Sequence, residues 1–201
     1  MFNQLGSLRS FLTTTLLLVI TLSFLSIGIG TSTVQSVDRE QTFFTEITDK
    51  IGLSSGSRVW PNGTYAMHEI IGGGVAVFDY DRDGKLDLLQ IRFPPPNQSG
   101  ATSRNLLFQQ QADGTFLDVT EESQLGDSGY GQGVAIGDTD NDGDLDVYFA
   151  NFGHDTFYRN NGDGTFIEAT SVSGFSGNEW STSAAFVDYN RDNDLDLYIA
   201  H

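Results

Sequence analysis

The feature that most constrains the fold of this chain is a stretch of 17 residues that occurs three times. The copies align without gaps at residues 74–90, 133–149 and 183–199, and their leading aspartates are 59 and 50 residues apart. Each copy runs from a short apolar segment through a cluster of acidic residues into a second short apolar segment. A recurring unit of this kind indicates a propeller or a solenoid rather than a domain with a single core.

Two other elements recur between these copies and complete the repeating unit. A Phe-x-acid-x-Thr segment is found at residues 44–48, 116–120 and 166–170, and a run that ends in Asp-Gly-Thr-Phe is found at residues 107–116 and 157–166. An Asp-Gly pair between two strand-like segments is a strong signal for a hairpin. One unit is therefore predicted to be strand, acidic loop, strand, variable linker, strand, Asp-Gly turn, strand.

Four short antiparallel strands per unit are typical of a propeller blade. We therefore expect an all-β chain, a β-propeller built of four-stranded antiparallel blades, of which about three are present. The units are expected near residues 72–120, 131–170 and 182–201. Small residues beside each first strand, such as Gly74 and Gly133, suit a crowded inner strand.

Each acidic loop is nine residues long and places oxygen-bearing side chains at its positions 1, 3, 5 and 9. Position 6 is Gly84, Gly143 or Asn193, and these residue types tolerate the positive φ of a sharp turn. Hard oxygen ligands at alternating positions suit Ca²⁺, which takes about six to eight of them, and the backbone carbonyl at position 7 would add another. The loops thus predict about three structural Ca²⁺ sites. The predicted ligands are Asp79, Asp81, Asp83, Lys85 and Asp87 in the first loop, Asp138, Asp140, Asp142, Asp144 and Asp146 in the second, and Asp188, Asn190, Asp192, Asp194 and Asp196 in the third.

Two other interpretations explain these loops less well. An EF-hand requires a glutamate at position 12 and helices on both sides, but position 12 is Gln90, Phe149 or Ile199 and the flanking segments resemble strands. Aspartate and glycine also form polar turns without any metal. A turn alone, however, needs no acid at position 9, directly beside the apolar second strand.

Charge distinguishes the three loops from one another. Their formal charges are −2, −5 and −3 in chain order, because the first contains Arg82 and Lys85 and the third contains Arg191. Crowded like charges cost stability unless a cation is bound. We therefore predict the tightest binding at the second loop and the weakest at the third, where Asn190 replaces a carboxylate and Asn193 replaces a glycine.

The composition argues against several classes of function. The formal net charge is −17, which disfavours nucleic acid and anionic membranes as partners because both demand a basic surface. The chain has no cysteine, so disulfides, thiolate metal sites and thiol nucleophiles are excluded. None of the three histidines lies in a spacing typical of a catalytic or metal site, and no catalytic residue is predicted.

The N-terminal segment differs sharply from the rest of the chain. Residues 1–36 carry a single charge, at Arg9, followed by an apolar run over residues 11–25 and a tail of small residues. This is the layout of a secretory signal peptide, and an uncleaved membrane anchor is the alternative because the apolar segment can reach about 18 residues. We expect a signal at residues 1–36, a partial propeller at residues 37–201, and no other membrane insertion. The expected location is secreted or extracellular, or else periplasmic or at the cell surface.

The repeating unit resembles a known family. The pattern Gly-Val-Ala-x-x-Asp-x-Asp-x-Asp-Gly-x-Leu-Asp at residues 133–146, followed by Asn-Gly-Asp-Gly-Thr-Phe at residues 161–166, is similar to the FG-GAP/VCBS-type repeats of calcium-binding β-propellers. The similarity extends over about residues 42–201 and is greatest to the ASPIC/UnbV, or cartilage-acidic-protein-like, group.

The resemblance implies a function and an organisation that the residues alone do not give. It implies a secreted calcium-binding protein of adhesion or recognition, with a protein or glycan as its ligand. Because propellers of this family usually have seven blades, the chain is expected to be a fragment whose remaining blades belong to a longer protein. Relatives also occur in carbohydrate-active enzymes such as lyases, so a propeller portion of an extracellular enzyme is the alternative function.

Overall fold

The computed structural model describes residues 44–53, 67, 73–92, 105–175 and 177–201. It confirms the predicted all-β class, because every sheet in the described part is antiparallel and two of the sheets have four strands. All of these sheets lie in one compact unit, Glu46–His201. The predicted signal segment at residues 1–36 lies outside the described residues. Among the residues that are described, no helix has the length and apolar character needed to cross a membrane.

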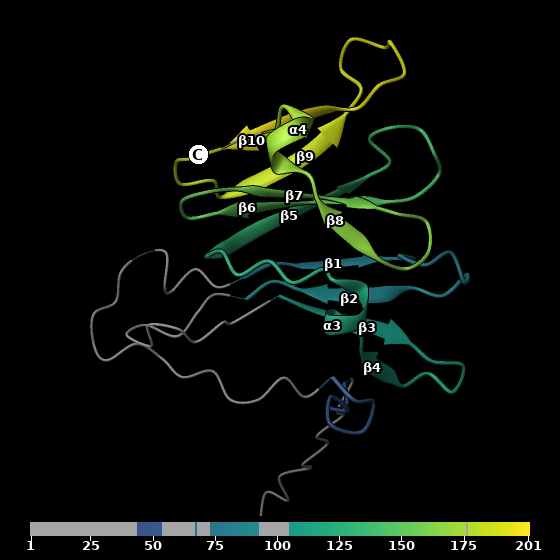
Figure 1. Ribbon diagram of the computed structural model, residues 1–201. Coiled ribbons are helices and arrows are strands. Elements are labelled where there is room, and N and C mark those ends of the chain that lie inside the picture. Colours follow the sequence, from purple (N-terminus) through teal and green to yellow (C-terminus); the bar gives the residue numbers. More distant parts are fainter. Residues whose placement is uncertain (1–43, 54–66, 68–72, 93–104, 176) are drawn as a thin grey trace, which may run out of the picture. The chain divides into compact units, whose positions relative to one another are not determined.

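The strands form three sheets in chain order, each a simple meander (Figure 1). The first sheet has the order β1-β2-β3-β4, the second has the order β5-β6-β7-β8, and the third pairs β9 with β10. The order strand, loop, strand, linker, strand, turn, strand is as predicted for the first two units. The bounds are Val75–Phe78 (β1), Asp87–Gln90 (β2), Leu106–Gln110 (β3), Phe116–Asp118 (β4), Gly131–Gly137 (β5), Asp146–Asn151 (β6), Thr156–Asn160 (β7), Phe166–Glu168 (β8), Ser183–Val187 (β9) and Asp196–Ala200 (β10).

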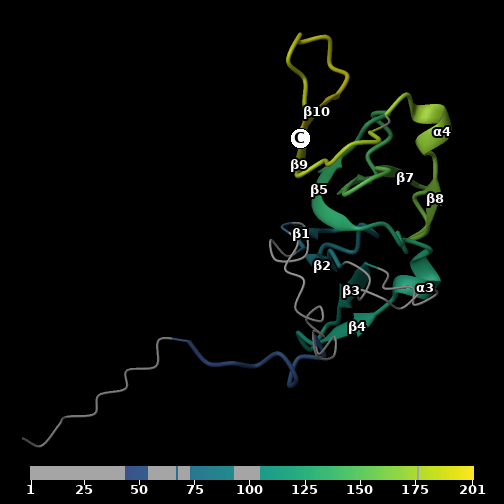
Figure 2. The ribbon, with the colours of Figure 1, turned by 90° about the vertical axis from the view of Figure 1, so that its left-hand side faces the viewer.

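The pairing register is the same at equivalent positions of the three units. Phe78 pairs with Asp87, Gly137 with Asp146, and Val187 with Asp196, so each acidic loop closes the same end of its sheet. The three first strands β1, β5 and β9 lie on one side of the compact unit and the two short helices lie on the opposite side (Figure 2). A Cβ atom on Gly133 would lie 3.1 Å from the carbonyl oxygen of Thr182, which confirms that the first strands are crowded.

Two short helices, α3 (Thr120–Ser123) and α4 (Thr170–Ser173), follow the outer strands and were not predicted. The recurring threonine explains them. The backbone N–H of Leu107 donates to Thr120 Oγ1 at 2.9 Å, and that of Phe157 donates to Thr170 Oγ1 at the same distance. The threonine therefore ends the outer strand and fastens the turn to the third strand of the same sheet.

The segment before the first sheet contains another copy of this turn. The N–H of Thr48 donates to Glu46 Oε1 at 2.8 Å, as the N–H of Thr170 does to Glu168 Oε1. The segment is fastened to the first sheet by the N–H of Phe116, which donates to the carbonyl oxygen of Ile51 at 2.7 Å. Sequence similarity at residues 44–48 therefore corresponds to similar local structure.

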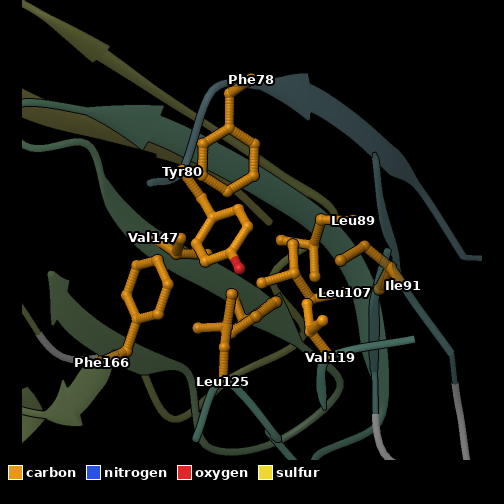
Figure 3. Packing of buried hydrophobic residues seen from close by; sticks show 10 residues of the cluster. Phe78, Tyr80, Leu89, Ile91, Leu107, Val119, Leu125, Val147 and Phe166 are labelled. Carbon is orange, nitrogen blue, oxygen red and sulfur yellow. The ribbon is translucent and has the colours of Figure 1, made fainter. Parts of the chain in front are cut away.

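Apolar side chains fill the space between neighbouring sheets. Tyr80 stacks against Phe166 across the first of these junctions, with ring centroids 6.3 Å apart (Figure 3). The buried residues of this junction are Phe78, Tyr80, Leu89, Ile91, Leu107, Val119, Leu125, Val147, Phe149 and Phe166. The junction between the second and third sheets contains buried Ala135, Tyr148, Ala150, Phe157 and Ala169 and partly buried Phe175, Ala184, Phe186, Leu197 and Ile199.

Candidate metal-binding loops

The first aspartate of each loop holds the turn together through backbone amides. Asp138 accepts hydrogen bonds from the N–H groups of Asp142 at 3.1 Å and Gly143 at 3.0 Å. Asp79 and Asp188 make the equivalent bonds to the fifth and sixth residues of their own loops. The sixth residue has a positive φ in all three loops, 85° at Gly84, 91° at Gly143 and 75° at Asn193, as the residue types predicted.

The aspartate at position 5 of each loop makes a second and tighter turn. Its Oδ1 accepts the N–H of the seventh residue at 2.8 Å in Asp83 and Asp142 and at 3.0 Å in Asp192. Such bonds are the usual way in which aspartate side chains organise a turn. Each carboxylate oxygen can accept about two hydrogen bonds or ligands, so these contacts fix the loop and leave oxygens free to face a cation.

The aspartate at position 9 of each loop also has a structural role. Asp87 is fully buried, and its two oxygens accept the N–H groups of Gln110 at 2.8 Å and Tyr80 at 3.2 Å. Asp146 likewise accepts the N–H of Asn160 at 2.9 Å and both the N–H and the hydroxyl of Thr139. The ninth acid therefore joins the loop to the third strand, which is a reason for its presence that the sequence interpretation overlooked.

Carboxylates gather into two groups in which one oxygen from each residue lies within 4.8 Å of the corresponding oxygens of the other two. One group is Asp79, Asp81 and Asp87 in the first loop, and the other is Asp138, Asp140 and Asp142 in the second loop. Three hard oxygen donors this close suit a divalent cation such as Ca²⁺, and the site can be completed by carbonyl oxygens and water. The structure therefore brings together six of the predicted side-chain ligands in two of the three predicted sites.

Asp83, Asp146 and the acids of the third loop lie outside these groups. Asp83 is drawn to the ammonium of Lys85, 2.5 Å away, whereas the equivalent Asp142 has no cation beside it in its own loop. In the third loop, position 3 is Asn190, which supplies an amide instead of a carboxylate. No three of the four acids of this loop form such a group in the described part of the chain. The assignment of the full predicted set as metal ligands stays a prediction.

Two contacts to the aspartate at position 3 of the loop were missed from the sequence. Gln109 Nε2 donates to Asp81 Oδ2 at 2.6 Å, and Arg159 Nε lies 3.4 Å from Asp140 Oδ2. Gln109 and Arg159 occupy the same position in β3 and β7. Their shared position in the repeat was the available signal, but Gln109 and Arg159 lie 28 and 19 residues from the aspartates that they contact. Arg159 also brings a positive charge to the loop that contains no base of its own.

Burial and crowding shift the pKa values of these acids. Burial raises the pKa of Asp87 to about 6 against the backbone hydrogen bonds that oppose it. The pKa of Asp140 is raised by burial and then by the neighbouring charges of Asp142 and Asp146. The pKa of Asp83 is lowered by its hydrogen bond to Lys85. A bound cation would favour the charged form of each acid and relieve the cost that burial and crowding impose.

A contact between consecutive loops was not predicted. Arg82, the fourth residue of the first loop, makes a bidentate pair with Asp144, the seventh residue of the second, with Nε–Oδ1 at 2.8 Å and Nη2–Oδ2 at 3.0 Å. Asn141, the fourth residue of the second loop, donates to Asp194 Oδ1 at 3.2 Å, which is the seventh residue of the third. The seventh residue therefore contacts the preceding unit through its side chain.

Comparison with known proteins supports the repeat. The family described as FG-GAP-like repeat matches residues 97–149 and 138–199, which together span more than half of the 201 residues. Both matched segments include the second loop. No curated protein matches the chain.

Proposed function

Because this chain belongs to the FG-GAP-like repeat family, we propose that it is a calcium-binding repeat protein in which Ca²⁺ ions occupy the acidic loops. The observation that carries the proposal is the pair of carboxylate groups, each with oxygens within 4.8 Å of one another. Aspartate oxygens on a tight turn suit Ca²⁺, whereas Zn²⁺ prefers histidine or cysteine and Mg²⁺ tends to keep its waters.

The proposed role of the ion is structural. Each loop joins the first two strands of a sheet, and its acids repel one another when no cation is present. An ion held by Asp138, Asp140 and Asp142 would offset this repulsion and fix the ends of β5 and β6. Further proposed ligands in the first two loops are Asp83, Asp146 and the carbonyl oxygens of Lys85 and Asp144, and those of the third loop are Asp188, Asn190, Asp192, Asp194 and Asp196.

The proposed location and binding role of the protein are based on the sequence. We propose a secreted or cell-surface protein with a signal at residues 1–36 and the repeat domain at residues 37–201, because the first segment has the charge and apolar pattern of a signal peptide. From the sequence resemblance we further propose that the chain belongs to the ASPIC/UnbV group and acts in adhesion or recognition of a protein or glycan.

Thermal unfolding tests the calcium site. We expect the melting temperature, followed by far-ultraviolet circular dichroism, to rise when EGTA is replaced by Ca²⁺, because a ligand that binds only the folded chain stabilises it by about 2.7 kcal/mol at 100 times its Kd. Mg²⁺ at the same concentration should produce a smaller rise. An unchanged melting temperature would contradict the proposal.

A matched pair of variants locates the effect. Asp138→Asn combined with Asp142→Asn removes two acids of the second loop and should remove part of the Ca²⁺-dependent rise. Asp113→Asn combined with Asp163→Asn is the control, because both are exposed aspartates of hairpin turns whose Oδ1 atoms accept from Thr115 and Thr165 and because two charges are again removed. It should leave the Ca²⁺-dependent rise unchanged, and an equal loss in both variants would argue for nonspecific charge screening.

A further inference from the structure

The contact between consecutive loops follows a rule that both internal junctions obey. At each junction the fourth residue of one loop reaches the seventh residue of the next, as Arg82 does to Asp144 and Asn141 does to Asp194. Both fourth residues have a left-handed backbone conformation, with φ of 58° and 59°. The same conformation recurs at the fourth residue of the third loop, Arg191, with φ of 65°.

The backbone therefore holds Arg191 in its loop as it holds Arg82 and Asn141 in theirs. The carboxylates of Asp188 and Asp192 accept the same backbone hydrogen bonds as their equivalents in the first two loops, so the Cα–Cβ bond of Arg191 leaves the turn in the same direction. Its side chain is exposed, and its guanidinium has no ion pair among the residues described. At the first junction, the cation in this position is bound by a carboxylate of the following unit.

The sheet face beside Arg191 repeats a surface that is covered elsewhere. Tyr198 occupies the position of Tyr148, yet its exposed fraction is 67% whereas that of Tyr148 is 0%. Val187 occupies the position of Phe78, and the exposed fractions are 46% and 4%. Tyr148 and Phe78 are buried because the following sheet packs against them. In Figure 1 the sheet of β9 and β10 is the last of the three sheets, and no other sheet of the described residues covers this face.

We propose that this surface, the exposed face of β9 and β10 with Arg191 beside it, binds a further repeat unit whose loop carries a carboxylate at its seventh position. The apolar side chains of Val187 and Tyr198 would be covered by the first two strands of that unit. Arg191 would pair with the carboxylate, because guanidinium and carboxylate groups form bidentate hydrogen bonds as Arg82 and Asp144 do. Asp144 shows the side chain that the partner must carry.

A second copy of this chain does not meet that requirement. The opposite end of the array is the face of β1 and β2, where Val75 and Val77 are exposed and an open groove of about 430 Å³ lies beside Leu53 and Phe108. The seventh residue of the adjoining loop is Lys85. Head-to-tail association would place Arg191 against Lys85, and two like charges in contact are unfavourable.

This inference is separate from the calcium proposal. The rule uses the side chain of the seventh residue, whereas the predicted metal ligand at that position is the backbone carbonyl oxygen. Docking of a further unit should therefore occur in EGTA as well as in Ca²⁺. A failure of docking would leave the calcium proposal standing, and the reverse also holds.

A chain extended by its own repeats tests the rule. Copies of residues 152–182 and then 133–175 are added after His201, which supplies the third sheet with two more strands and adds a fourth unit. The residue copied from Asp144 is kept as aspartate or changed to lysine, and each version is combined with Arg191 or with Arg191→Asp. The four chains form a double-mutant cycle.

The two oppositely charged combinations should melt higher than the two like-charged ones, by about 2–4 °C in EGTA and in Ca²⁺. The same cycle at Arg82 and Asp144 of the unextended chain provides the reference size. If this internal cycle shows coupling and the extended one does not, the proposal is overturned. Equal melting of all four extended chains overturns it as well.

A chemical readout accompanies the melting curves and does not depend on cooperative unfolding. Nitration by tetranitromethane, followed by peptide mass spectrometry, should modify Tyr198 readily in the natural chain and only as slowly as Tyr148 in the extended chain with arginine and aspartate. Undiminished reaction of Tyr198 there would overturn the proposal. Sedimentation of the natural chain should show no dimer that Arg191→Asp dissociates, and such a dimer would mean that a second copy is the partner.

Discussion

The junction between the first and second sheets and the junction between the second and third sheets use the same repeat positions but are filled differently. The first contains large, fully buried side chains such as Phe149 and Leu125, and a bidentate ion pair joins its loops. The second also buries Tyr148 and Phe157, but its other buried members are alanines, the apolar side chains of the third sheet are only partly buried, and a neutral amide replaces the guanidinium. The repeat thus fixes where neighbouring units touch, whereas the residue at each position decides how strongly they are held.

The largest difference between the junctions should come from their apolar side chains. Phe149→Ala is expected to lower the free energy of unfolding by about 3–5 kcal/mol, because it empties a fully buried position. Ile199→Ala changes the equivalent position of the third unit, which is only partly buried, and should cost about half as much or less. Urea unfolding in Ca²⁺ measures both values. Equal losses would mean that the two junctions are equally well packed.

Calcium should act more strongly on the second loop than on the third. Asp138→Ala is expected to remove about 2–3 kcal/mol of Ca²⁺-dependent stability and Asp188→Ala clearly less, because the third loop has one carboxylate fewer at its alternating positions. Both aspartates also accept backbone hydrogen bonds. Each variant is therefore compared with itself in EGTA, so that the loss of turn structure cancels. Calorimetry that found the third loop to bind tighter would reverse the predicted order.

The loop contacts should differ in their response to salt. Asp144→Asn should cost about 1 kcal/mol because it weakens a charge-assisted pair, and the loss should shrink between about 0.05 M and about 0.5 M NaCl. Asn141→Gly should cost about 0.5 kcal/mol with little dependence on salt, because glycine keeps the positive φ of 59° and the amide that is lost is neutral. Thermal unfolding at both salt concentrations separates the two contacts. A salt-independent loss in Asp144→Asn would argue against the ion pair.

The metal-free chain should also respond to pH through Asp87. The folded pKa of Asp87, about 6, lies above its usual value. The folded state therefore binds the proton more tightly, and the contribution of this group to stability is greatest below about pH 4 and is lost as the pH rises through about 6. In EGTA, Asp87→Asn should melt with a shallower fall between pH 4 and pH 6 than the natural chain. An identical slope in the two chains would mean that the burial of Asp87 carries no cost.

The strands could be predicted because the same pattern of apolar segments occurs in all three copies of the repeat. The apolar segments before and after each acidic loop have the length and composition of strands, and the Asp-Gly turns at residues 113–114 and 163–164 join two more. The helices α3 and α4 could not, since four residues are too few for a helical period. The recurring threonine was the signal for these helices. The sequence does not show, however, that its hydroxyl accepts a hydrogen bond from the third strand.

The candidate site was predicted in part for a similar reason. Alternating oxygens at Asp138, Asp140 and Asp142 are local, and the structure does group them. The contacts of Asp87 to Gln110 and of Arg82 to Asp144 join residues 23 and 62 positions apart. They depend on how strands pair and on how one unit is placed on the next, and neither is set by local residue types.

Lys85 makes the loop of the first unit differ in charge from the loops of the other two units at position 7. A protein made of similar units presents one kind of surface at each end, and contacts between unlike ends continue from molecule to molecule and generate filaments unless a ring closes. During synthesis the same similarity lets a unit pair with the wrong neighbour. A lysine where the other two loops have aspartate makes the first unit a poor partner for the third. One reversed charge in an otherwise repeated loop thereby disfavours contact between the first unit of one copy and the third unit of another.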